Sequence, residues 1–217
     1  MFRRVWSVLS QNLSNINFKI NLLLFFLTLI VFDVNGQKSW ELVKNNSGIE
    51  LWTKDFPESK IKQFKLRTLI SCSLHDAYVV LKDIKNMSHW YDRIKKVELL
   101  KEISQNEGMY LLEYELPFPF ENRFSTVYGK IEFTPDKLTA TTEYKKFHLP
   151  GGYDDKIIVT QLWSTWEIIP KSEGQVEVTH SGFMDPKGNI PDWLINDGVT
   201  SGPLKTIRAF KNQISQI

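Results

Sequence analysis

Residues 185–194 read DPKGNIPDWL, and this stretch decides the fold of the chain. Its two prolines and its glycine predict a tight turn, because proline restricts the backbone angle φ and glycine accepts positive φ. Beyond the turn, bulky apolar residues recur at helical spacing, at Trp193, Leu204, Ile207, Phe210 and Ile214. The sequence therefore predicts a long amphipathic helix over residues 190–217, which Gly202-Pro203 interrupts with a kink.

Upstream of this turn, apolar and polar residues alternate as they do in half-buried strands. The alternating runs cover residues 49–52, 61–71, 93–102, 108–116, 123–133, 138–147, 157–169 and 175–183. Turn-forming residues separate many of these runs, for instance Asn106-Glu107-Gly108 and Pro135-Asp136-Lys137. Consecutive strands joined by short turns predict an antiparallel meander.

A shorter helix is expected after the run that ends at residue 71. Apolar residues repeat at helical spacing over residues 74–84, and Ser73 suits the N-cap position with Asp76 three residues later. An antiparallel sheet and a long amphipathic helix bury their apolar surfaces well when the sheet curls around the helix. The space between sheet and helix is a natural ligand cavity.

The composition suits one globular domain with little net charge. The chain has 217 residues, of which 42% are hydrophobic, and this is enough for a single core. Its 27 Lys and Arg residues nearly balance 25 Asp and Glu residues, so no strong field attracts a polyanion and nucleic acid is not an expected partner. The single cysteine, Cys72, excludes a disulfide within the chain and a metal site built from several thiolates.

Residues 1–36 are interpreted as an export signal. The apolar run at residues 22–32 follows a polar and basic segment, and it is too short to cross a bilayer as a helix of about 20 residues. We expect cleavage between Gly36 and Gln37 and a periplasmic or secreted protein whose mature domain spans residues 37–217. An uncleaved amphipathic anchor and a buried helix are the alternative interpretations of the segment.

Familiar catalytic motifs are missing from the sequence. It contains no Gly-x-Ser-x-Gly elbow, no His-Glu-x-x-His pair, no phosphate-binding loop and no dinucleotide-binding glycine pattern. We therefore expect no catalytic residue, no cofactor and no metal ion. His180 is the histidine to test, because it shares a strand face with Val176, Val178 and Met184. An imidazole on an apolar face either hydrogen-bonds a ligand hydroxyl or headgroup, or is satisfied by the backbone within the core.

Two motifs resemble signatures of the START (steroidogenic-acute-regulatory-protein-related lipid transfer) domain family. They are PFPFENR at residues 117–123 and DPKGNIPDWL at residues 185–194. Trp40, Gly48-Ile49 and Trp90 also fall in the order that the family shows. The second motif is the more specific of the two, because a turn with two prolines and a glycine directly before a terminal helix is rarely met by chance.

The resemblance covers about residues 39–214. It implies an α+β helix-grip fold of the Bet v 1-like superfamily, in which a curved antiparallel sheet wraps around a long C-terminal helix. It also implies a deep apolar tunnel that binds one lipid or sterol. Phe124 stands where the family usually has an acidic residue after the arginine, and this departure concerns the salt bridges of Arg123 rather than the fold.

Candidate ligand-binding residues come from strand faces, from the terminal helix and from the few polar groups near them. Arg123 is expected at the mouth of the cavity, with a surface ion pair to Glu121 or Glu115 as the alternative. The full set of candidates is Tyr110, Leu112, Tyr114, Arg123, Val127, Trp163, His180, Met184, Trp193, Leu204 and Ile207.

The expected function is non-catalytic binding or transfer of a lipid, a sterol or another hydrophobic small molecule. A cyclase or aromatase-type enzyme of the Bet v 1-like superfamily, acting on a hydrophobic substrate, is the alternative. We expect a monomer whose partners are a lipid or sterol-like molecule and, transiently, a membrane.

Overall fold

The computed structural model describes residues 39–217 except residues 58, 150 and 173. The chain divides into two units, Met1–Ser39 and Trp40–Ile217, and every helix and strand described belongs to the second unit. The expected export signal and its cleavage point lie outside the described residues.

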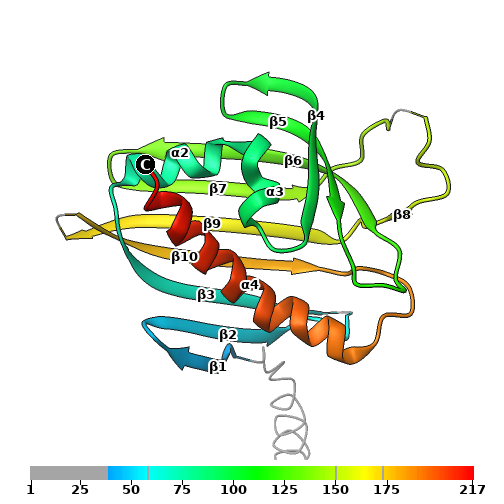
Figure 1. The fold of residues 1–217 in the computed structure, drawn as a ribbon, viewed down its shortest axis with the longest axis horizontal. Helices are drawn as coiled ribbons and strands as arrows, with labels where there is room; N and C mark the ends of the chain where they lie inside the picture. Colours follow the sequence, from blue (N-terminus) through cyan, green and yellow to red (C-terminus); the bar gives the residue numbers. More distant parts are fainter. Residues whose placement is uncertain (1–38, 58, 150, 173) are drawn as a thin grey trace, which may run out of the picture. The chain divides into compact units, whose positions relative to one another are not determined.

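The described residues form a sheet with helices on one of its faces (Figure 1). The strands are β1 Glu41–Asn46, β2 Ile49–Asp55, β3 Lys62–Ser71, β4 Ile94–Ser104, β5 Glu107–Tyr114, β6 Arg123–Thr134, β7 Lys137–Tyr144, β8 Ile157–Ile158, β9 Leu162–Ser172 and β10 Gln175–Met184. The helices are α2 Leu74–Lys82, the 3-10 turn η1 Ile84–Asn86, α3 Met87–Trp90 and α4 Asp192–Ile214.

The strands pair in the order β1-β2-β3-β10-β9-β7-β6-β5-β4, and every pair on this path is antiparallel. The long helix α4 runs diagonally across the sheet (Figure 1). The predicted α+β fold, a curved antiparallel sheet around a long C-terminal helix, is therefore confirmed.

The prediction of one continuous meander is wrong, because β3 pairs with β10. Residues 72–93, which hold α2, η1 and α3, carry the chain from β3 to β4 at the far edge of the sheet. The strands that follow return across the sheet until β10 reaches β3. Segments that are neighbours in the sequence are therefore not neighbours in the sheet at this point.

The predicted strand at residues 157–169 is also corrected. Its start, β8, pairs in parallel with Arg123 and Phe124 at the beginning of β6, whereas β9 starts at Leu162 and pairs with β7 and β10. The register between β6 and β7 stops at Val127, so the first residues of β6 are free to bind another segment. Alternation along the sequence does not show where a chain changes its pairing partner.

The core lies between α4, α2 and the sheet, and it is rich in aromatic rings. Trp166 and Phe210 have ring centroids 4.9 Å apart, and Trp90 lies 5.9 Å from Trp166 and 5.5 Å from Phe210. The predicted N-cap of α2 is confirmed: the Ser73 hydroxyl accepts from the backbone N–H of Asp76 at 3.1 Å, and the Asp76 carboxylate accepts from the N–H of Ser73 at 2.9 Å.

Helix α4 continues through Gly202-Pro203, so the predicted interruption is wrong. A proline inside a helix removes one backbone hydrogen bond and favours a break. Here Gly202, Pro203 and Leu204 are all buried, and this packing holds the helix together across the proline. Gly202 also leaves room for a neighbour, because a Cβ there would lie 3.2 Å from a carboxylate oxygen of Asp92.

Candidate functional site

A cavity lies between the sheet and α4, with about 210 Å³ of space open to the centres of water molecules. One water needs only about 10–15 Å³ by this measure, so the cavity is far larger than a packing defect. Its apolar wall comes from the segment around α3, from several strands and from the first half of α4. This wall includes Met87, Ile94, Leu112, Leu116, Ile131, Leu162, Met184, Ile190, Leu194 and Val199.

Six of the predicted ligand-binding residues line this cavity: Tyr110, Leu112, Tyr114, Trp163, His180 and Met184. The first three point to it from one face of β5, as the alternation of that strand predicts. The structure thus brings together residues from β5, β9 and β10. Their contact with a ligand stays a prediction.

Four other predicted residues lie away from the cavity lining. Val127, Leu204 and Ile207 are buried in the core, and Trp193 is 62% exposed. Successive side chains of an α-helix point in directions that differ by more than a quarter of a turn about the helix axis. Leu194 therefore faces the cavity, and its neighbour Trp193 does not. Apolar spacing identifies the buried side of a helix but not which buried residues border an empty space.

Arg123 is likewise absent from the cavity lining, and the prediction of a place at its mouth is wrong. Its guanidinium is buried and donates to backbone carbonyls: Nε to Pro186 at 2.6 Å, Nη1 to Glu121 at 2.6 Å and Nη2 to Lys187 at 3.2 Å. The alternative, a surface ion pair with Glu121 or Glu115, is also wrong, because Arg123 is 3% exposed and meets Glu121 through the backbone carbonyl. Burial lowers the pKa of Arg123. Arg123 therefore ties the start of β6 to the turn before α4.

A compact polar cluster lies in the cavity wall and consists of Tyr91, Ser164 and His180. Nε2 of His180 lies 3.1 Å from the Tyr91 hydroxyl and 3.2 Å from the Ser164 hydroxyl, and the two hydroxyls are 3.5 Å apart. Of these three residues, only His180 was predicted from the sequence; Tyr91 and Ser164 were not. Tyr91 directly follows Trp90 in a short aromatic segment, which was the one available signal for it.

The polar cluster is electrically neutral near pH 7. Burial lowers the pKa of His180 to about 3 and raises the pKa of Tyr91 to about 12. The imidazole stacks on Trp166 with ring centroids 4.0 Å apart. It is 1% exposed, and its Nδ1 atom has no hydrogen-bond partner among the residues that the structure describes.

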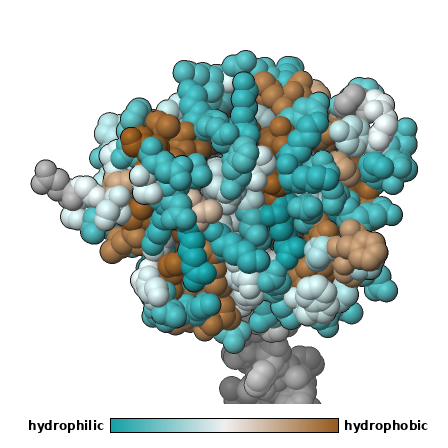
Figure 2. Space-filling view, viewed as in Figure 1, coloured by the Kyte–Doolittle hydropathy of each residue, from teal (hydrophilic) through white to brown (hydrophobic). Residues whose placement is uncertain are grey.

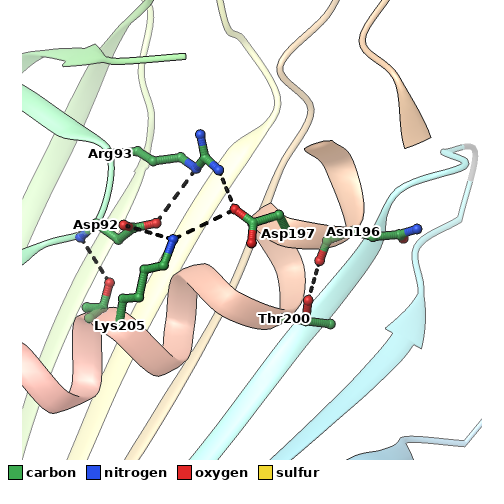
Figure 3. A network of polar contacts seen from close by, with 7 residues as sticks. Asp92, Arg93, Asn196, Asp197, Thr200 and Lys205 are labelled. Carbon is green, nitrogen blue, oxygen red and sulfur yellow. Dashed lines mark hydrogen bonds and ion pairs between the residues drawn. The ribbon is translucent and has the colours of Figure 1, made fainter. Parts of the chain in front are cut away.

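A charged network joins the segment after α3 to helix α4 (Figure 3). Arg93 hydrogen-bonds Asp197, and its Nε lies 3.7 Å from a carboxylate oxygen of Asp92. Lys205 approaches Asp92 at 4.0 Å and Asp197 at 3.9 Å. Burial raises the pKa of Asp92. Asp92 and Arg93 border the cavity, and their facing atoms, Oδ2 of Asp92 and Nε of Arg93, are buried without a hydrogen-bond partner among the described residues.

Two kinds of feature are absent from the described residues. They contain no group of three or more His, Cys, Asp or Glu side chains that could hold a metal ion. Within the same part of the chain, no helix is long and apolar enough to cross a membrane.

Known proteins of similar structure identify the fold. A STAR-related lipid transfer protein of Xanthomonas axonopodis superposes with a TM-score of 0.71 at 26% sequence identity, over 82% of this chain and 99% of that chain. The chain has the START fold. Human STARD10 superposes with a TM-score of 0.72 at 16% identity, over 82% of this chain and 73% of that chain.

Sequence comparison gives a more limited result. An uncharacterized protein of Pseudomonas aeruginosa is 26% identical over 186 residues, which are 84% of this chain and 91% of that protein. No family model matches the chain. The resemblance to START domains, read from residues 117–123 and 185–194, is confirmed through the three-dimensional structure, and in this START fold the cavity lies between the sheet and α4.

Proposed function

We propose that this protein binds one lipid, sterol or other hydrophobic small molecule in its cavity and does not convert it. The observation that carries the proposal is a cavity of about 210 Å³ with mostly apolar walls and a small cluster of uncharged polar groups. Burial of an acyl chain in such a cavity is favourable by about 0.8 kcal/mol per CH₂ group before the entropy costs of binding. A carrier needs no other chemistry.

The comparison with the Xanthomonas axonopodis protein supports a lipid as the ligand class. That protein is named a lipid transfer protein, and it shares the START fold at 26% identity over nearly its whole length. Export after cleavage near Gly36/Gln37 belongs to the same proposal, and it would place the carrier in the periplasm or outside the cell.

Transient contact with a membrane is a further part of the proposal. Phe118 and Trp193 are 97% and 62% exposed, and hydrophobic areas lie between hydrophilic ones on the face that carries α4 (Figure 2). Arg123 binds carbonyls of Glu121, three residues after Phe118, and of Pro186 in the turn before α4. The two exposed aromatic residues therefore belong to segments that one arginine joins.

The chemistry of the cavity supports a carrier more than a cyclase. A general base works best with a pKa near the operating pH, whereas burial lowers the pKa of His180 to about 3. Cys72 is not part of the cavity lining, and burial raises the pKa of its thiol to about 11. Neither group is an activated base or nucleophile at neutral pH.

Occupation of the cavity can be tested by filling it with a side chain. Thr142 on β7 lines the cavity, whereas Thr139 on the same strand has the opposite parity and is not part of the lining. We expect Thr142→Trp to weaken binding of the neutral fluorescent probe N-phenyl-1-naphthylamine by at least about tenfold, and Thr139→Trp to leave it unchanged. Equal binding by both folded variants would contradict the proposed site.

A further inference from the structure

The polar cluster is built from three separate parts of the chain. Tyr91 caps the C-terminal end of α3, Ser164 lies on β9 and His180 lies on β10. Both hydroxyls converge on one atom, Nε2 of the imidazole, at 3.1 Å and 3.2 Å. Aromatic rings hold the imidazole in place, with Trp166 stacked on it and Phe64 edge-on at 5.0 Å. The cluster is thus rigidly positioned in the cavity wall.

The cluster has unused hydrogen-bonding capacity. Nδ1 of His180 is buried without a hydrogen-bond partner among the described residues, and a buried polar atom left in this state is destabilising. A neutral imidazole has one donor and one acceptor nitrogen, and each hydroxyl can donate once and accept twice. The Nε2 contacts therefore leave lone pairs free on the hydroxyls of Tyr91 and Ser164, two residues that line the cavity, whereas Nδ1 is itself enclosed.

From this arrangement we infer that the polar cluster recognises the uncharged hydroxyl group of an otherwise apolar ligand, and that it selects alcohols over carboxylates and phosphates. The inference rests on the proposed function and names the ligand class for the same cavity. A hydroxyl both donates and accepts, so it complements a cluster that offers donors and acceptors together. Long-chain alcohols and sterols carry this chemistry.

The charges around the cavity explain why an anionic headgroup is disfavoured. A buried anion needs a cation or several donors, because an unpaired charge is costly in an apolar site. Each cationic side chain of the cavity lining already has a partner. Arg93 hydrogen-bonds Asp197, and its Nε, which has no hydrogen bond among the described residues, lies 3.7 Å from the Asp92 carboxylate. Lys130 pairs with Glu132 at 2.7 Å, and Lys82 lies over the Tyr78 ring at 5.2 Å. None of them hydrogen-bonds the polar cluster. The imidazole of His180, within the polar cluster, stays neutral at physiological pH, because burial lowers its pKa to about 3.

The test measures displacement of N-phenyl-1-naphthylamine by ligands that differ only at the polar end. Dodecane, dodecan-1-ol and dodecanoate are compared at pH 8, and cholesterol delivered from a cyclodextrin separates sterols from chain alcohols. The variants are Tyr91→Phe, Ser164→Ala and His180→Phe, and thermal unfolding checks that each is folded. Tyr128→Phe is the matched control, because it removes a tyrosine hydroxyl on β6 that is not part of the cavity lining.

We expect Tyr91→Phe and Ser164→Ala to weaken dodecan-1-ol or cholesterol binding by about three- to tenfold and to change dodecane binding by less than about twofold. Tyr128→Phe should change neither. Wild-type protein should also bind dodecanoate at least about tenfold more weakly than dodecan-1-ol.

Two results overturn the inference alone: dodecanoate that binds as tightly as dodecan-1-ol, or alcohol and sterol binding that no folded cluster variant weakens. In either case, continued binding of the probe and of dodecane leaves the proposed function standing. If neither the probe nor dodecane binds to wild-type protein, the proposed function fails and the inference fails with it. His180→Phe adds a third variant if either of the other two does not fold.

Discussion

Arg123 and His180 are buried polar residues that differ in how many of their nitrogen atoms have hydrogen-bond partners. Arg123 donates to three backbone carbonyls, whereas His180 has one ring nitrogen without a partner among the described residues. A buried cation that donates a hydrogen bond from each of its three nitrogens stabilises the fold, because its removal leaves its partners unsatisfied. Tyr91 and Ser164, whose hydroxyls contact His180, line the cavity, and the proposed ligand contacts the cluster through them. Buried polar residues therefore take different roles according to how many of their hydrogen-bonding atoms have partners.

We expect Arg123→Ala to lower the free energy of unfolding by about 2–4 kcal/mol, because it strands carbonyls of Pro186, Lys187 and Glu121. Arg123→Lys should recover only part of the loss, since one ammonium group cannot replace the planar fork of a guanidinium. Urea denaturation measures the effect. Lys156→Ala, which removes an exposed ion pair with Asp155, is the control and should leave stability unchanged. Wild-type stability in Arg123→Ala would refute the structural role.

The pH dependence of stability tests the burial of His180. Burial lowers its pKa to about 3 from 6.5, so between these pH values the unfolded chain binds a proton that the folded protein does not. Stability due to this group is present above pH 6.5 and falls as the pH falls toward 3. We expect a loss on the order of 1–2 kcal/mol between pH 7 and pH 5.

His180→Phe should remove most of that loss, whereas His148→Gln, at an exposed histidine, should not. Urea denaturation at both pH values gives the slopes. Parallel pH profiles for wild type and His180→Phe would show that the imidazole is not held neutral in the folded protein.

At the scale of elements, α4 serves two purposes along its length. Its first half borders the cavity through residues such as Leu194, and its second half packs into the core through Leu204, Ile207 and Phe210. The effect of a substitution in α4 therefore depends on which half of the helix carries it. Core positions affect stability, and cavity positions affect ligand binding more strongly.

We expect Leu204→Ala to lower the free energy of unfolding by about 2–5 kcal/mol with little change in probe affinity. Leu194→Ala only enlarges an existing cavity, so its stability loss should be smaller and its effect on N-phenyl-1-naphthylamine binding larger. Urea denaturation and probe titration separate the two effects. A Leu204→Ala protein of normal stability but weak probe binding would reverse the assignment of these two residues.

Some elements could be predicted from the sequence because their signals are local. The capping residues Ser73 and Asp76 mark the start of α2, and residues 185–194 mark the turn before α4. Strand β1 escaped prediction because all its residues are exposed, so it has no buried face and no alternation. Strands β8 and β9 were predicted as one strand over residues 157–169, because the hydrophobic pattern does not depend on which strand a segment pairs with.

The candidate site belongs to the scale of the whole molecule, and this explains which parts of it the sequence could show. Tyr91 and His180 are 89 positions apart, and Tyr91 and Ser164 are 73 positions apart. Strand parity placed His180 on an inward face, but only the pairing of β9 with β10 and the position of α3 bring the three side chains together. Long-range register therefore creates the polar cluster, and local patterns cannot reveal it.

The proposed export of the protein predicts a defined mature N-terminus. The apolar run at residues 22–32 and the residues up to Gly36 lead us to expect that protein purified from its natural compartment begins at or near Gln37. Intact-mass measurement and N-terminal sequencing of that material check the expectation. A chain that retains Met1 and stays in the cytoplasm would remove the localisation from the account.

The most direct test of the central claim is native mass spectrometry of the protein purified under mild conditions and then incubated with a total lipid extract. We expect one bound neutral amphiphile per chain, which organic solvent releases and which is lost in the cavity-filling Thr142→Trp variant but not in Thr139→Trp. Identification of the released molecule then names the ligand. A wild-type protein that carries only its own mass after incubation, with no amphiphile in the solvent extract, would contradict the claim that this cavity holds a hydrophobic ligand.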